Sequence, residues 1–349
     1  MMADLSIVEG PYLHDIFDQP SALESTLKTL TVSPPLDAVT RRLQRGDFQN
    51  VILTGMGSSF HALHPLNLQL IRSGIRSLMV ETSELIHYHR RMFEASNLIV
   101  AVSQSGQSAE MLRLLDVNHD RSAIVGVTNT ADSPLALRVN AAVLTAAGKE
   151  FSVSCKTYIS ALMALQWMGN VFCGSDLGAA QADLAGVIPL VRSYLDNWKQ
   201  HVLDFCDRLR QIRQLFLVGR GPSLAAVGTG ALTIKESDHF PAEGMSSAAF
   251  RHGPFEMLGD ETFVLVFAGD DATRALNLRL FQDILQEQGK AEWIAADANF
   301  VPCRLLPGPV SIQPLLEILP VQMITLALAL RTGREPGKFD RATKVTTVE

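Results

Sequence analysis

The chain has 349 residues, of which 47% are hydrophobic and 19% are charged, so it can bury a large core and is long enough for about two domains. Lysine and arginine together number 30 against 36 aspartates and glutamates, and the two signs are mixed along the chain. There is no basic stripe or tail, which argues against a nucleic-acid partner. The four cysteines stand far apart without metal-ligand spacing, as is typical of isolated thiols in a reducing compartment.

Two further segments favour a cytoplasmic protein with no membrane partner. The first twenty residues are acidic and lack the apolar run of a secretory signal. Residues 315–330 are the most apolar stretch of the chain, but they include Glu317, Pro320 and Gln322. A membrane span needs about 20 mostly apolar residues, so we expect this stretch to form a buried helix.

The predicted elements alternate between short apolar strands and amphipathic helices. In chain order we expect a helical lead-in over residues 1–35, a first α/β domain over 36–180, a linker helix over 181–210, and a second α/β domain over 211–349. The predicted strands lie within the segments NVILTG (50–55), SLMVET (77–82), LIVAV (98–102), AIVGVTN (123–129), QLFLVG (214–219), TFVLVF (262–267) and AEWIAAD (291–297).

The two domains look like copies of one pattern. NVILTGMGSS at 50–59 runs a strand into a Gly-x-Gly turn, and QLFLVGRGPS at 214–223 does the same 164 positions later. Strands that alternate with helices form parallel sheets with helices on both faces. We therefore predict two tandem α/β units, each a three-layer, Rossmann-like or flavodoxin-like sandwich.

Hydroxyl side chains gather where the strand at 98–102 ends. Ser103, Gln104, Ser105, Gly106 and Ser108 follow it, and a helical pattern begins at residue 109. Ligands of open parallel sheets bind outside the carboxyl ends of the strands, and a helix N-terminus attracts anions. These residues therefore predict a site for a phosphate held by neutral donors.

Ser58 and Ser59 stand at the matching place after the first strand and would close the same site. The alternative is that Ser105 and Ser108 merely cap the helix. A dinucleotide site at Gly55-x-Gly57 is weaker, because the third glycine is missing.

The second copy differs at the corresponding strand end, where it has Ala268, Gly269, Asp270 and Asp271. Carboxylates repel anions, so we expect the phosphate site in the first copy alone.

GMGSS, SQSGQS and the later KESDHFPAEGMSSAAFRHGP resemble the sugar isomerase (SIS) domains, and in particular the isomerase half of glucosamine-6-phosphate synthase and its stand-alone relatives. The resemblance implies two tandem SIS domains and a homodimer with shared active sites. It implies a sugar phosphate as the small-molecule partner, with no cofactor and no metal.

The resemblance also implies roles for individual residues. The family's catalytic residues fall on Glu236 as the acid/base, His252 as the ring-opening group supplied across the dimer, and Lys344 at the open-chain carbonyl. Its phosphate-binding and substrate-binding residues fall on Ser58, Ser103, Gln104, Ser105, Ser108, Val153 and Ser154.

Chemistry supports these roles. The isomerisation needs one carboxylate that reaches both C1 and C2 of the sugar, and ring opening needs a group such as histidine that titrates near neutrality. Lysine can form a Schiff base with the sugar carbonyl or act through its charge. Simpler alternatives stay open: Glu236 beside Lys235 as a solvated pair, His252 as a turn cap, and Lys344 as a surface cation.

Met56 and Thr233 stand where the synthase has cysteine and lysine, so the chain departs from the family pattern at these two positions. The chain also shows no cysteine before Cys155 to serve a glutaminase.

We therefore expect a glucosamine-6-phosphate deaminase-like reaction that releases ammonia. The alternatives are a deglycase acting on fructosamine or glucosyl-amino-acid 6-phosphates, simple aldose–ketose isomerisation, and a phosphosugar sensor without catalysis.

Overall fold

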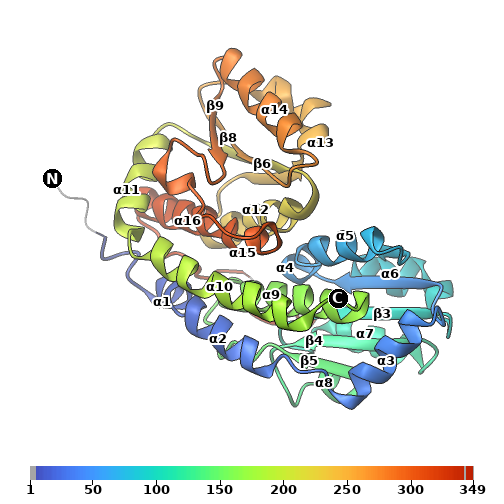
Figure 1. Cartoon of the computed structure of the whole chain (residues 1–349). Coiled ribbons are helices and arrows are strands. Elements are labelled where there is room, and N and C mark those ends of the chain that lie inside the picture. Colours follow the sequence, from blue (N-terminus) through green and yellow to red (C-terminus); the bar gives the residue numbers. More distant parts are fainter. Residues whose placement is uncertain (1–4, 342, 349) are drawn as a thin grey trace. The chain divides into compact units, whose positions relative to one another are not determined.

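The computed structural model describes residues 5–341 and 343–348, which form two compact units. The first unit comprises residues 21–150, 155–185 and the described part of 342–349. The second unit comprises the described part of 1–20 together with 151–154 and 186–341. Each unit contains one parallel sheet flanked by helices, as predicted (Figure 1).

The first unit is built on a five-stranded sheet of order β2-β1-β3-β4-β5, and every pairing in it is parallel. Its strands are β1 (Asn50–Gly55), β2 (Ser77–Met79), β3 (Asn97–Val102), β4 (Ala123–Thr128) and β5 (Ala141–Leu144). Every residue of β3 and β4 is buried. These two strands read as continuous apolar runs because helices cover both faces of the sheet.

Helices lie on both faces of this sheet. The helices of the unit are α3 (Pro34–Gln44), α4 (Gly57–His61), α5 (His64–Arg72), α6 (Thr82–Tyr88), α7 (Ala109–Asn118), α8 (Pro134–Arg138) and α9 (Lys156–Cys173). Side chains of α6, α7 and α8 pack on strand residues Ile52, Ile99 and Ile124 in one buried cluster. Helix α9 contacts α3, α5 and β4, which makes the third layer.

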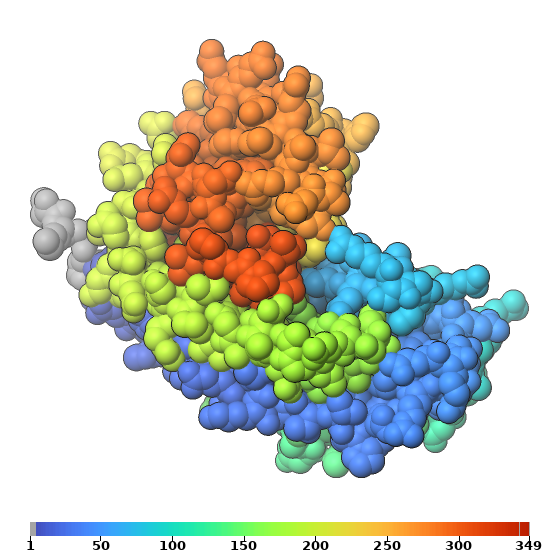
Figure 2. All heavy atoms as spheres, viewed as in Figure 1, coloured from blue at the N-terminus to red at the C-terminus, as the bar shows by residue number. Residues whose placement is uncertain are grey.

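The second unit has a four-stranded parallel sheet of order β7-β6-β8-β9. Its strands are β6 (Gln214–Gly219), β7 (Ala242–Ser246), β8 (Thr262–Phe267) and β9 (Lys290–Ile294). Its helices are α1 (Pro11–Phe17), α11 (Trp198–Arg208), α12 (Leu224–Asp238), α13 (Ser247–Arg251), α14 (Arg274–Gln286), α15 (Gln313–Leu316) and α16 (Ile318–Thr332). Two further helices, α2 (Gln19–Thr29) and α10 (Leu177–Leu195), run across the boundaries between the units. Helix α14 forms part of the outer surface of the second unit (Figure 2).

Glycines let α12 approach its sheet closely. A Cβ on Gly244 of β7 would lie 2.5 Å from the carbonyl oxygen of Val227, and one on Gly230 would lie 2.7 Å from Leu217 Cδ2. No side chain fits at either position without movement of the backbone or of the core.

The most apolar segment is a core helix, as expected. Val310–Thr332 is long and apolar enough to cross a membrane, but 94% of its most apolar window is buried inside the protein.

Two strands were not predicted. The segment AEGMS of β7 is small and polar, and AAVL of β5 has only four residues, so neither carries a strand pattern. Pro34 and Pro35, at the end of the predicted lead-in, are the first two residues of α3. The N-cap residue of α3, Ser33, accepts a hydrogen bond from Leu36 N at 3.4 Å.

Candidate functional site

The two hydroxyl-rich turns of the first unit lie side by side. β1 and β3 are neighbours in the sheet, and their last residues, Gly55 and Val102, are register partners. The turn with Ser58 and Ser59 therefore starts level with the turn that begins at Ser103. Both lie at the carboxyl edge of the sheet, where open parallel sheets bind their ligands.

The Ser103–Ser108 turn is fixed by its own hydrogen bonds. Ser103 Oγ accepts from Gly106 N at 3.1 Å, and Ser105 Oγ accepts from Gln107 N at 3.3 Å. Gly106 has φ +63°, and a Cβ there would lie 2.6 Å from Ser133 Cβ. Glycine is therefore required at this position, and the turn is preorganised.

Helix capping does not explain the serines. Ser108 is the N-cap residue of α7, yet its side chain makes no capping hydrogen bond. Ser105 bonds within the turn, two residues along the chain, and not at the first turn of α7. Within residues 5–341 and 343–348, the half-buried side chains of Ser58, Ser59, Gln104 and Ser108 form no hydrogen bond, so they can donate to a bound anion.

The end of the chain lies at this same edge. Thr346 O accepts a hydrogen bond from Ala109 N, the first residue of α7, at 3.1 Å. The side chain of Lys344 is only 25% exposed, and its Nζ contacts Glu150 Oε2. Lys344 is therefore a partly buried, paired cation, which rules out the alternative of an ordinary surface lysine.

Sequence reasoning missed Glu150. Its side chain is fully buried. Oε1 accepts from the backbone N–H groups of Cys155 and Thr157, both at 2.9 Å, and Oε2 accepts from Thr157 Oγ1 at 2.6 Å. A signal was available, because a carboxylate just before a long helix is stabilised by the N–H groups and the dipole of the helix N-terminus.

Val153 and Ser154 belong to the second unit, in the loop that precedes α9. Val153 is 1% exposed and Ser154 is half-buried. Phe151 N donates to Asp15 Oδ2 at 2.7 Å, which ties the loop to the start of the chain. Any contact of Val153 with a ligand would have to use its backbone.

Glu236 lies near the end of α12 in the second unit. Its side chain is half-buried, whereas the neighbouring Lys235 is exposed. The two side chains thus lie in different environments, which does not fit two equally solvated residues.

The C-terminal segment is fastened to the end of this same helix. Arg334 donates to Ser237 O at 3.3 Å and pairs with Asp340 at 2.9 Å, and Gly337 N donates to Ser237 Oγ at 2.9 Å.

His252 follows α13 and is exposed. Residues Val227 and Ala231 of α12 lie against Gly244 in the middle of β7, so Glu236 lies further along α12, toward the amino end of the strand. His252 comes after the carboxyl end of β7, which is about 16 Å long. Helix α13 then turns back along the sheet, since Phe250 packs against Phe216 of β6, so the length of β7 alone does not set the separation of Glu236 and His252.

The corresponding edge of the second unit is acidic, as predicted. Ser223 Oγ, after β6, donates to Glu317 Oε1 at 2.7 Å. Burial raises the pKa of Glu317 to about 7; the Ser223 hydrogen bond opposes this shift, and the charge of Asp270 adds to it. This edge is not suited to an anion.

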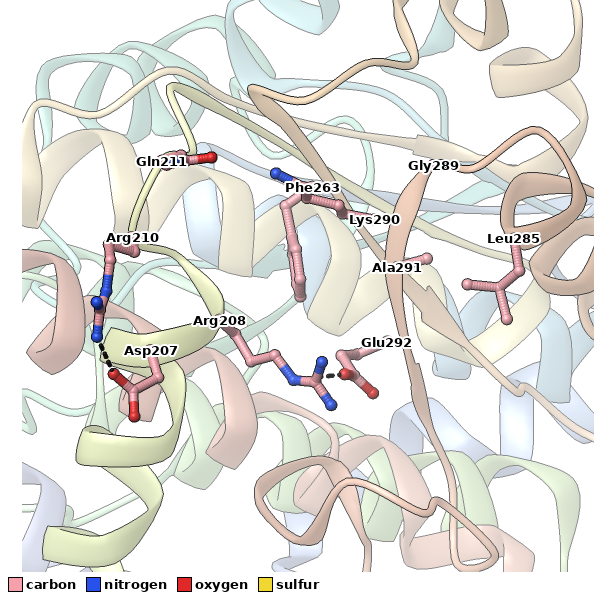
Figure 3. A pocket seen from close by; sticks show the side chains of 10 residues that line it. All are labelled: Asp207, Arg208, Arg210, Gln211, Phe263, Leu285, Gly289, Lys290, Ala291 and Glu292. Atoms are coloured by element: carbon pink, nitrogen blue, oxygen red, sulfur yellow. Dashed lines mark hydrogen bonds and ion pairs between the residues drawn. The ribbon is translucent and has the colours of Figure 1, made fainter.

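A surface pocket of about 500 Å³ lies elsewhere in the second unit (Figure 3). It includes Phe263 and Lys290, which stand near the starts of β8 and β9, at the edge opposite the carboxyl ends. Two of its arginines pair with carboxylates, Arg210 with Asp207 at 2.8 Å and Arg208 with Glu292 at 3.1 Å. Lys290 Nζ donates instead to the backbone oxygen of Asp260 at 2.6 Å.

A family model matches part of the chain that lies mostly in the first unit. Residues 47–170 match the SIS domain model, and this range contains all the hydroxyl residues of both turns. That the second unit is a further SIS domain remains a prediction.

Curated relatives align with the whole chain. The glutamine–fructose-6-phosphate aminotransferase (isomerizing) of Pyrococcus horikoshii is 28% identical over 364 residues, which cover 100% of this chain and 59% of the relative. That of Pyrobaculum aerophilum is 26% identical and covers 98% of this chain and 58% of the relative. The chain thus spans about three fifths of the length of these relatives.

Solved structures share the fold. The C-terminal domain of glucosamine-fructose-6-phosphate aminotransferase from Francisella tularensis superposes with a TM-score of 0.80 at 18% identity, over 93% of this chain and 96% of that one. Tagatose-6-phosphate ketose/aldose isomerase from Escherichia coli gives 0.78 at 20% identity, over 100% and 98%. Glucosamine-6-phosphate deaminase from Thermotoga maritima gives 0.76 at 17% identity, over 97% and 100%. Residues 47–170 thus match the SIS domain model, and almost the whole chain shares the fold of these solved structures.

Proposed function

We propose that this protein is a phosphosugar isomerase-type enzyme that converts an amino-sugar 6-phosphate to a ketose phosphate and ammonia. The observation that carries the proposal is the placement of Lys344 beside the hydroxyl-rich turns, held by Glu150 and by the Thr346–Ala109 hydrogen bond. An amine that can meet a sugar carbonyl thus lies at the same sheet edge as donors suited to a phosphate.

The proposed roles follow from the chemistry of the substrate. The two turns hold the phosphate, and His252 moves a proton from the C1 hydroxyl to the ring oxygen as the ring opens. Glu236 takes the proton from C2 and returns it to C1, while one proton of the amine passes to the C1 oxygen, so the C2 amine becomes an imine and the aldehyde becomes a hydroxyl. Water then adds at C2, ammonia leaves, and the ketose phosphate remains. Lys344 assists at C2 through its charge or as a Schiff base.

Release of ammonia is the proposed direction because it needs only the sugar-phosphate site and water. Synthesis of the amino sugar at the same site would need a supplied ammonia donor.

We further propose that His252 acts in the active site of a partner subunit in a homodimer, as the resemblance implies. Its exposure supports this assignment. Mixing Glu236→Gln and His252→Ala proteins tests it, because heterodimers regain one intact site and should recover activity that neither variant has alone.

The main test is turnover of glucosamine 6-phosphate, followed by ammonia and ketose phosphate in parallel. Glu236→Gln should abolish both products, whereas Glu335→Gln, which changes an exposed carboxylate, should not. Unphosphorylated glucosamine should be a poor substrate. Equal activity of Glu236→Gln would reject the assigned role, and released amino acid from a glycated amino-acid 6-phosphate, without ammonia from glucosamine 6-phosphate, would identify a deglycase.

A further inference from the structure

We infer that Glu150 is a positioning residue: its buried carboxylate holds the Lys344 ammonium at the phosphate-binding edge of the first unit. This inference deepens the proposed function, on which its catalytic meaning rests. The contact itself can be tested without any substrate.

Burial makes the contact specific. The Glu150 side chain is 0% exposed and the Lys344 side chain is 25% exposed. A buried carboxylate is costly unless donors surround it, and Glu150 has two backbone N–H groups, one hydroxyl and the ammonium. The pair therefore differs from the exposed Lys338–Glu335 pair of the same tail, where the side chains are 60% and 42% exposed.

The two carboxylate oxygens of Glu150 have different hydrogen-bond partners. Oε1 is fixed by the N–H groups of Cys155 and Thr157 at the start of α9. Because Oε1 is fixed, the direction of Oε2 is fixed as well, and Oε2 meets Lys344 Nζ and Thr157 Oγ1. The N-terminus of an 18-residue helix thus determines where the ammonium lies.

A second anchor prevents the tail from sliding. The Thr346 carbonyl bonds to Ala109 N, one residue after Ser108. Lys344 is therefore held between α9 and α7, the helices that follow β5 and β3. An amine held in place before substrate arrives loses less freedom in the reaction.

The test measures how fast Lys344 is acetylated by acetic anhydride at pH 8, read by peptide mass spectrometry of the whole protein. The reagent must reach the amine, and the contact with Glu150 holds the Lys344 side chain at 25% exposure. Glu150→Gln keeps an oxygen for the α9 N–H groups but removes the charge. We expect acetylation of Lys344 to become faster, because the released side chain is more accessible, and Glu335→Gln, the matched control, to leave the Lys344 rate unchanged.

An unchanged Lys344 rate in Glu150→Gln would overturn the inference, whatever the protein does to sugars. A faster rate together with absent turnover in the wild-type protein would retain the positioning role and reject the proposed function. If the positioning role and the proposed function are both correct, Glu150→Gln should lower kcat more than it changes KM, because the hydroxyl-rich turns remain intact.

A second variant covers the case in which Glu150→Gln does not fold. Lys344→Met leaves the carboxylate buried without its cation and should lower the melting temperature, whereas Lys338→Met should not. Equal melting temperatures for Lys344→Met and the wild-type protein would also overturn the inference.

Discussion

Glu317 makes the stability of the second unit depend on pH in a direction opposite to most carboxylates. It is 2% exposed, one oxygen accepts from Ser223, and within the described residues the other has no hydrogen-bond partner. Burial raises its pKa from 4.5 to about 7. The folded state therefore prefers the protonated acid.

The size of the effect follows from this shift. Below pH 4.5 the Glu317 side chain is neutral in both the folded and the unfolded state, so its ionisation does not lower the free energy of unfolding. Above pH 7 it is charged in both, and each unit of raised pKa costs about 1.36 kcal/mol, giving about 3 kcal/mol in all. The cost grows as pH rises from 4.5 to 7, because the unfolded chain releases its proton first.

Glu317→Gln removes this titration while keeping an oxygen for Ser223. Relative to the wild-type protein, its free energy of unfolding should increase by about 3 kcal/mol between pH 4.5 and pH 8, so the variant becomes the more stable protein. Urea denaturation at several pH values, followed by tryptophan fluorescence, measures it, with Glu335→Gln as an exposed control. Parallel pH dependences of Glu317→Gln and the wild-type protein would refute the reasoning.

Three further predictions concern the phosphate turn and the tail. Gly106→Ala places a Cβ against Ser133 at positive φ. We expect the protein to lose about 1–3 kcal/mol of stability and to lose the binding of inorganic phosphate, measured by calorimetry. Unchanged binding would show that the turn is not the phosphate site. Ser108→Ala should keep the melting temperature, because the Ser108 side chain makes no capping hydrogen bond, and it should raise KM for the sugar phosphate. A loss of stability near the roughly 1 kcal/mol of a helix cap would contradict this prediction. Arg334→Met removes the ion pair with Asp340 and should speed proteolysis of the C-terminal tail and lower kcat. A protease digestion pattern identical to that of the wild-type protein would show that Arg334 does not hold the tail.

The local patterns of the sequence were enough to predict the two parallel sheets and the hydroxyl turns. Alternating strands and helices, Gly106 and the serines around it act within a few residues of one another. Hydrogen bonding and turn geometry at that range depend on neighbouring residue types. The short strands β5 and β7 carried no such pattern, and only pairing with their neighbours makes them strands.

Tertiary structure alone decided what surrounds the proposed catalytic groups. Glu150 and Lys344 are 194 positions apart, and Thr346 meets Ala109 across most of the chain. Nothing local brings such residues together, because their contact depends on how helices pack on the sheet and on which charges that packing buries. The sequence by itself predicted the hydroxyl-rich turn proposed to bind a phosphate, whereas the packed fold decided which carboxylate contacts Lys344.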